Sequence, residues 1–262
     1  MIIRTSLFLL LYVFFIHSSY SQSKGDSLRF VWENKNELDS IRFKAIDAYY
    51  DLYTYSQPDS TLIVTTYHYE LAQEKNAIEQ MVWALNHKGI IHYSKGENDI
   101  ANNFYTEAAT LASPLNNPVL TSTIQGNIGN VYSRQKNYQK ATQHYAAALK
   151  EYQEQKNEKG EARMLNNLGG IYQVIGNYDL ALEYYYKSLS IFEKNDVQNR
   201  KIGLLFLNIG SIQLLQEKYD EAIASFEKSQ TIFQTANESI FEAICINNIA
   251  EVYQKWGRAN QA

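Results

Sequence analysis

The sequence predicts an all-α fold in which pairs of helices stack side by side into a solenoid. Three observations support this prediction. A pattern of small and aromatic residues recurs about every 40 residues, each unit has the apolar spacing of two amphipathic helices, and the 262-residue chain contains only three prolines. A single helix pair cannot bury its own apolar face, whereas a stack of pairs can, so the recurring pair indicates a solenoid.

A small residue anchors each unit. Successive anchors are 40, 40, 41 and 40 residues apart, and they are Gly89, Gly129, Gly169, Gly210 and Ala250. Twelve residues after each anchor the chain has an alanine: Ala101, Ala141, Ala181, Ala222 and Ala262. Sixteen residues after the first four anchors it has a large aromatic residue: Tyr105, Tyr145, Tyr185 and Phe226. The small residues predict closely packed helices, with the aromatic ring filling the space between neighbouring pairs.

Turn signals separate the two helices of four units, at Gly96-Glu97, Lys136-Asn137, Gly176-Asn177 and Glu217-Lys218. With these turns in place, the string Leu165-x-x-Leu168-Gly169-x-x-Tyr172, followed by Ala181-x-x-x-Tyr185, resembles the tetratricopeptide repeat. The chain departs from that family in its 40-residue period and in the position of the family's first large aromatic, which here holds Gln125, Leu165, Phe206 and Ile246.

The resemblance implies a right-handed superhelical solenoid of helix hairpins, in which the first helix of each pair lines a concave groove. We expect about eleven repeat helices, made of five complete pairs and a last helix from Phe241 to Lys255.

Residues 1–21 predict a secretory signal peptide. Arg4 is their only charge, Leu7 to Ile16 is an unbroken apolar run, and small serines precede Gln22. Ten apolar residues are fewer than the about 20 that a membrane-spanning helix requires. We therefore expect cleavage between Ser21 and Gln22. The alternative is an uncleaved segment that anchors the chain in the membrane, facing the periplasm.

Two further regions follow. Residues 22–76 predict an N-terminal capping segment and a degenerate first repeat, which has Tyr49 in place of an anchor glycine and a helix start at Pro58. Residues 77–262 predict four complete repeats and a last one that stops before its second helix. We expect the chain to be the front part of a longer protein, or its last helix to be covered. The layout resembles the N-terminal periplasmic sensory region of Bacteroidetes signalling proteins, which precedes a histidine kinase, a nucleotide cyclase or a transcription regulator.

Composition and motifs argue against several functions. The formal net charge is −4 and no basic block is present, which argues against nucleic-acid binding through this region. Cys245, the single cysteine, predicts a small buried hydrophobe. His87 and His92 are five residues apart and lie on different helix faces, so the sequence predicts no metal site. For His92 it predicts a packing role. No catalytic constellation or cofactor motif occurs, so we expect neither enzyme activity nor a cofactor.

Asparagines beside the anchors predict a binding surface. An asparagine amide both donates and accepts hydrogen bonds, so it can hold the backbone of an extended peptide whatever its sequence, or it can brace a neighbouring helix. Both interpretations stay open. Leucines of the fourth unit form either an exposed apolar cluster or a face covered by further chain. The expected partner-binding residues are Asn86, Asn127, Asn130, Arg134, Arg163, Asn166, Asn167, Leu204, Leu207, Asn208, Leu214, Leu215, Asn247 and Asn248.

Together these features predict an exported, periplasmic scaffold that binds a protein or an extended peptide, as the sensory or interaction part of a signal-transduction protein. The alternative is a free-standing periplasmic assembly scaffold. An enzyme of unidentified type has no support in the sequence. Membrane contact is expected only through downstream chain or an uncleaved signal.

Overall fold

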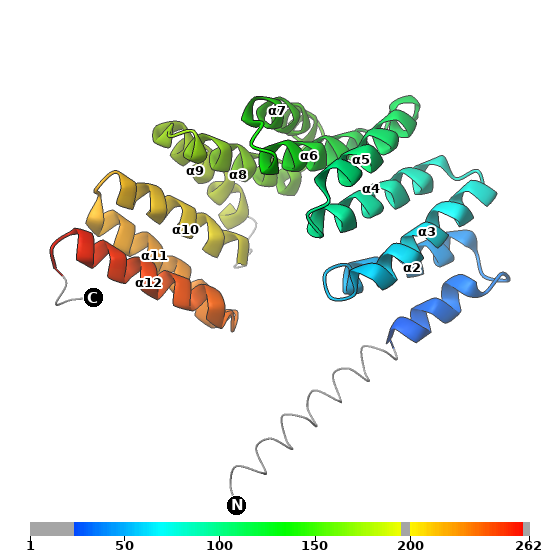
Figure 1. Cartoon of the computed structure of the whole chain (residues 1–262), viewed down its shortest axis with the longest axis horizontal. Helices are drawn as coiled ribbons and strands as arrows, with labels where there is room; N and C mark the ends of the chain where they lie inside the picture. Colours follow the sequence, from blue (N-terminus) through cyan, green and yellow to red (C-terminus); the bar gives the residue numbers. More distant parts are fainter. Residues whose placement is uncertain (1–23, 195–199, 259–262) are drawn as a thin grey trace, which may run out of the picture. The chain divides into compact units, whose positions relative to one another are not determined.

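The computed structural model of the protein describes residues 24–194 and 200–258, and over these ranges the chain is helical and has no strand (Figure 1). Residues 24–33 are helical. The helices that follow are α2 Asp39–Tyr53, α3 Pro58–Glu74, α4 Ile78–Ser94, α5 Asn98–Ala112, the 3-10 turn η1 Ser113–Leu115, α6 Pro118–Arg134, α7 Tyr138–Glu154, α8 Glu158–Val174, α9 Tyr178–Lys194, α10 Arg200–Leu215, α11 Tyr219–Thr235 and α12 Ser239–Lys255. The all-α prediction is confirmed, and α2 to α12 match the expected repeat helices of the described chain.

The chain divides into two compact units at the junction of residues 116 and 117. The first unit contains α2 to α5, and the second contains α6 to α12. The predicted limits at residues 21, 76 and 262 stay predictions. The signal peptide and Ala262 lie outside the described residues, and among those described no helix is long and apolar enough to cross a membrane.

The turns inside the pairs are Schellman motifs, as the turn signals predicted. At the end of α6, the Asn137 amide donates to the Tyr132 carbonyl and the Lys136 amide to the Ser133 carbonyl. This pattern requires a left-handed residue after the helix. Gly176, with φ 82°, meets that requirement without steric cost, whereas Lys136 adopts φ 60° in the equivalent turn. After these two turns, Asn137 and Asn177 cap the next helix, because the side-chain oxygen of each accepts a backbone amide.

Each anchor glycine lies directly under the aromatic ring of its own pair. A methyl group at the anchor would meet the ring at 2.4 Å for Gly89 and Tyr105, 2.6 Å for Gly129 and Tyr145, 2.7 Å for Gly169 and Tyr185, and 2.8 Å for Gly210 and Phe226. No carbon atom fits at such distances. The alanines twelve residues after these anchors are also fully buried. The small residues therefore allow the two helices of a pair to approach, as the sequence predicted.

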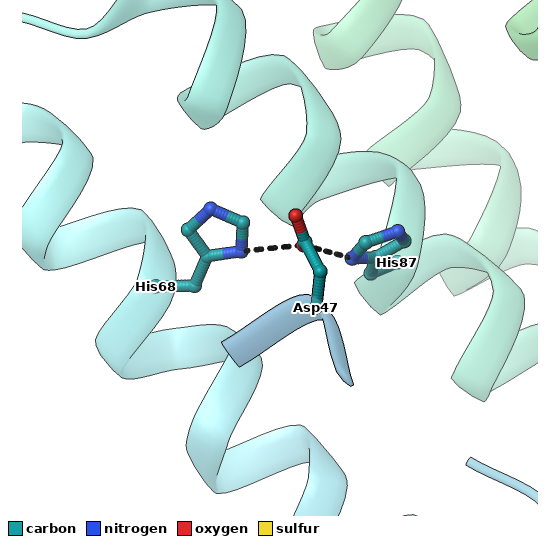
Figure 2. A group of neighbouring side chains, drawn as sticks. All are labelled: Asp47, His68 and His87. Atoms are coloured by element: carbon teal, nitrogen blue, oxygen red, sulfur yellow. Dashed lines mark ion pairs between the residues drawn. The ribbon is translucent and has the colours of Figure 1, made fainter. Parts of the chain in front are cut away.

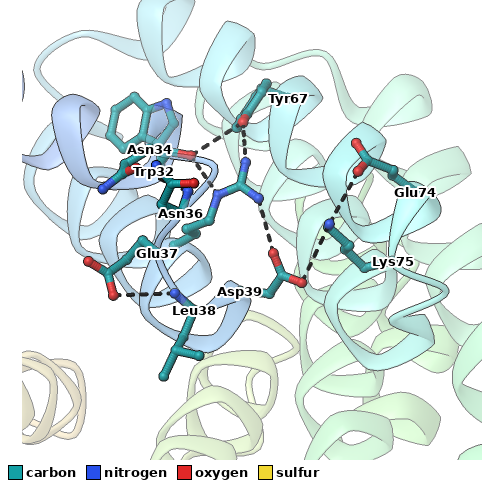
Figure 3. Close-up of polar contacts among 10 residues, drawn as sticks. Trp32, Asn34, Asn36, Glu37, Leu38, Asp39, Tyr67, Glu74 and Lys75 are labelled. Carbon is teal, nitrogen blue, oxygen red and sulfur yellow. Dashed lines mark hydrogen bonds and ion pairs between the residues drawn. The ribbon is translucent and has the colours of Figure 1, made fainter.

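A buried arginine holds the N-terminal helical segment in the first unit (Figure 3). The Arg42 guanidinium donates through Nε to the Trp32 carbonyl at 2.9 Å, through Nη2 to the Tyr67 hydroxyl at 2.9 Å, and through Nη1 to Oδ1 of Asp39 at 3.0 Å. Because each of these nitrogens has an acceptor, the cost of burying the charge is offset. Trp32 is thereby fixed against α2 and α3.

We predict that Gly169→Ala lowers the free energy of unfolding by about 1–3 kcal/mol, because the added methyl overpacks against the Tyr185 ring. Alanine would otherwise favour a helix by about 1 kcal/mol. The matched control is Gly170→Ala, whose methyl would lie 3.7 Å from the Tyr185 hydroxyl, an ordinary contact. Equilibrium unfolding in urea should show the control to be neutral or stabilised. Equal effects of the two substitutions would contradict the packing argument.

Candidate functional site

Four equivalent asparagines mark one side of the first helices in the second unit. Each lies two residues before an anchor and is partly exposed: Asn127 on α6, Asn167 on α8, Asn208 on α10 and Asn248 on α12. We call these four residues the asparagine stripe. The structure therefore places an amide at the same position of every repeat in this unit, as the sequence predicted.

In the first half of the stripe, asparagine braces neighbouring helices. The Asn167 amide donates to Oδ1 of Asn130 at 3.1 Å, which joins α8 to α6. The Tyr145 hydroxyl donates to the same oxygen at 2.8 Å. Asn166 donates to Oδ1 of Asn167 across 3.5 Å. For Asn130 and Asn167, the bracing alternative is therefore what the structure shows.

In the second half of the stripe, the amides have no such role. Within the described residues, the side chains of Asn208 and Asn248 form no hydrogen bond with the rest of the chain. Both are partly exposed, and the helices that carry them, α10 and α12, contact each other. Asn247, the neighbour of Asn248, is exposed. These amides keep their donors and acceptors for water or for a ligand.

The prediction that four leucines of α10 form an exposed apolar cluster is wrong for two of them. Leu207 and Leu214 are each only 8% exposed, in a core with Phe226 and Val252 of α11 and α12. They are buried because α10 packs against both helices, not against α11 alone. Leu204 is partly buried at the edge of this core. Leu215 is 52% exposed and stays available.

Asn86 also departs from the expected surface, because it is 2% exposed in the core of the first unit. It cannot contact a partner without opening the fold. The equivalent residues of later repeats differ, because Asn166 is partly exposed and Asn247 is exposed.

Exposed cations lie on the first helices of the second unit. Arg134 on α6 and Arg163 on α8 are exposed, as predicted. Arg163 also donates to the Tyr152 hydroxyl at 2.8 Å. Burial, with Lys159 and Arg163 nearby, lowers the pKa of Lys201 on α10. The sequence did not indicate that Lys159, Arg163 and Lys201 lie close together, because they occupy non-equivalent positions of two repeats.

A cavity in the first unit was also missed by the sequence. It has a volume of about 730 Å³ and lies between residues 24–33, α2 and α3, with Trp32, Tyr49 and Tyr67 in its walls. Of its charged residues Asp26, Arg29 and Glu33, the last two pair with each other at 2.7 Å. The cavity has the size of a small-ligand site, but these two charges are already satisfied.

Comparison with protein families and solved structures agrees with this architecture. The tetratricopeptide repeat family matches residues 80–154, 120–194 and 202–262. BtubC (BKLC) from P. vanneervenii is similar with a TM-score of 0.67 at 21% identity, over 79% of this chain and 87% of that one. The apo form of RapI is similar with a TM-score of 0.66 at 17% identity, over 92% of this chain and 73% of that one. A Rap protein complexed with Competence and Sporulation Factor is similar with a TM-score of 0.63 at 16% identity, over 85% of this chain and 69% of that one. These identities establish the fold alone, and no curated protein matches by sequence.

We predict that Asn167→Ala lowers the free energy of unfolding by about 0.5–1.5 kcal/mol, the usual net contribution of one hydrogen bond, because its bond to Asn130 is lost. Asn208→Ala at the equivalent position should change it by less than about 0.5 kcal/mol, as a partly exposed substitution does. Urea denaturation of both variants tests this difference. A larger loss for Asn208→Ala would show that its amide also braces the fold.

Proposed function

Because the chain belongs to the tetratricopeptide repeat family of protein-interaction scaffolds, we propose that it binds an extended peptide or protein segment along the asparagine stripe. Binding is non-catalytic in this proposal. The scaffold works outside the cytoplasm, in the periplasm, as the sensory or interaction part of a signal-transduction protein.

The observation that carries the proposal is the pair of amides at Asn208 and Asn248. They lie on contacting helices, they are partly exposed, and the described chain leaves both without a side-chain hydrogen bond. A peptide backbone offers one donor and one acceptor at each residue, so two equivalent amides can hold it without selecting its sequence. Leu204 and Leu215 lie on α10, as Asn208 does, and supply apolar surface for side chains of the partner.

The related folds support a ligand-holding role. One of the similar structures is a Rap protein in complex with Competence and Sporulation Factor, so in that protein the fold holds a binding partner. The exposed cations Arg134 and Arg163 would favour a partner segment with acidic residues.

We predict that a peptide selected on the chain from a random display library loses about tenfold in affinity with Asn208→Ala and Asn248→Ala combined. Two hydrogen bonds of about 0.5–1.5 kcal/mol each account for that change. Isothermal titration calorimetry measures the Kd, and circular dichroism checks that the fold is retained. The matched control replaces two exposed amides of the second helix α7, Gln139→Ala with Gln143→Ala, and should bind as the wild type does. Equal Kd values for wild type and the Asn208/Asn248 variant would exclude the stripe as the binding surface.

Export is proposed from residues 1–21, which lie outside the described part of the chain. We predict that the protein recovered from the periplasmic fraction begins at Gln22, by mass spectrometry of its N-terminal peptide. Leu10→Arg should keep the precursor in the cytoplasm, because a charge interrupts the apolar run. A wild-type chain that keeps Met1 in the membrane fraction would instead establish the uncleaved anchor, and one found in the cytosol would exclude export.

A further inference from the structure

Three side chains on consecutive helices of the first unit converge on one point (Figure 2). They are Asp47 of α2, His68 of α3 and His87 of α4. Nδ1 of His68 and Nδ1 of His87 each lie 4.0 Å from Oδ1 of Asp47. The three atoms lie within 4.8 Å of one another. They are far apart in the sequence, so the fold alone brings them together.

All three of these atoms are buried, and none has a hydrogen-bond partner. The His68 side chain is fully buried, and that of His87 is 12% exposed. No lysine or arginine of the described chain pairs with Asp47, and Asp51 adds a second negative charge near it. Buried polar atoms without partners are costly, so a group of three that point at one another requires an explanation.

The protonation of His68 is set by a neighbour. Nε2 of His68 lies 3.0 Å from Oε1 of Gln80, so this nitrogen carries the proton and donates it. Nδ1 therefore presents a lone pair towards Asp47 and His87. A hydrogen bond to the far nitrogen is how proteins orient a histidine that binds a metal ion. Burial also lowers the pKa of His68 to about 4 and that of His87 to about 3, which keeps both rings neutral at pH 7.

We propose that Asp47, His68 and His87 bind a divalent transition-metal ion, with zinc as the best fit. Two imidazole nitrogens and one carboxylate oxygen are a donor set that zinc accepts, with water in the fourth position. At a tetrahedral zinc ion with bonds of about 2.0–2.1 Å, ligand atoms lie roughly 3.4 Å apart. The two 4.0 Å separations would each have to shorten by about half an ångström on binding, and the separation of the two histidine nitrogens, which lies within 4.8 Å, by up to about 1.4 Å.

An ion can reach the site from the solvent. The Asp47 side chain is 43% exposed, although its Oδ1 is buried, so the carboxylate forms the outer edge of the group. The His87 ring stacks on the Tyr50 ring, with ring centroids 3.7 Å apart. A bound ion would join α2, α3 and α4 and so stabilise the first unit. His87 and His92, the pair considered from the sequence, do not share this site, because His92 instead contacts Phe104 and Glu97.

The test uses the chain with a histidine-free tag, stripped with EDTA and titrated with zinc chloride by calorimetry. We expect one zinc ion per chain and a raised melting temperature. Asp47→Asn and His68→Gln should each weaken the affinity by at least about tenfold. Asp47→Asn should disturb the fold less than His68→Gln, because the Asp47 side chain is partly exposed and asparagine has nearly the same shape as aspartate.

Two matched controls, His92→Gln and His144→Gln, each remove a histidine outside the group, and both should bind zinc as the wild type does. Cobalt(II) absorption bands typical of a tetrahedral site should appear in the wild type and controls, and disappear in Asp47→Asn. Equal zinc affinity in Asp47→Asn and the wild type would show adventitious binding elsewhere. No heat of binding and no change in melting temperature would show that the group holds water or nothing. Either result overturns the proposal.

Discussion

The contact between each anchor glycine and an aromatic ring sets the geometry on which the rest of the fold depends. At Gly169 and Tyr185 the ring occupies the space that a Cβ would fill, so the two helices of the pair are held close. A residue two positions before the glycine is rotated by roughly 200° from it and faces nearly the opposite way. The packing of the glycine therefore places Asn167, and its equivalents in other repeats, on the open side of the first helix.

Equivalent positions do not have equivalent roles. Asn167 is used by the fold, because Asn130 of the preceding repeat accepts its amide proton. Asn208 has the same position, but no such acceptor is found for it among the described residues. The difference arises because Asn130 follows the anchor Gly129, whereas Gly170 follows Gly169 and has no side chain to accept a bond. Surface chemistry in this protein thus depends on where a repeat departs from its neighbours.

The repeat architecture was predictable from the sequence, because spacing alone identifies Gly169, Ala181 and Tyr185 as one packed group. The turns were predictable for the same reason, even where Lys136 takes the left-handed conformation that glycine favours. Exposure within a repeat was not predictable, because the burial of Leu207 and Leu214 depends on how α10 meets α11 and α12. The meeting of Asp47, His68 and His87 was not predictable either. Asp47 and His87 share a repeat position, two residues before Tyr49 and Gly89, but the spacing does not indicate that His68 of α3 lies beside them.

The packing of helices within each unit is almost entirely between neighbours in the chain. In the second unit α6 packs on α7, α7 on α8, and so on to α12. Smaller contacts also join α8 to α10 and α10 to α12. Such local contacts close short loops, so they cost little chain entropy and are associated with fast folding. No distant segment must arrive before a pair can form. A chain delivered from one end can therefore gain structure progressively, with each completed pair serving as the surface on which the next one folds.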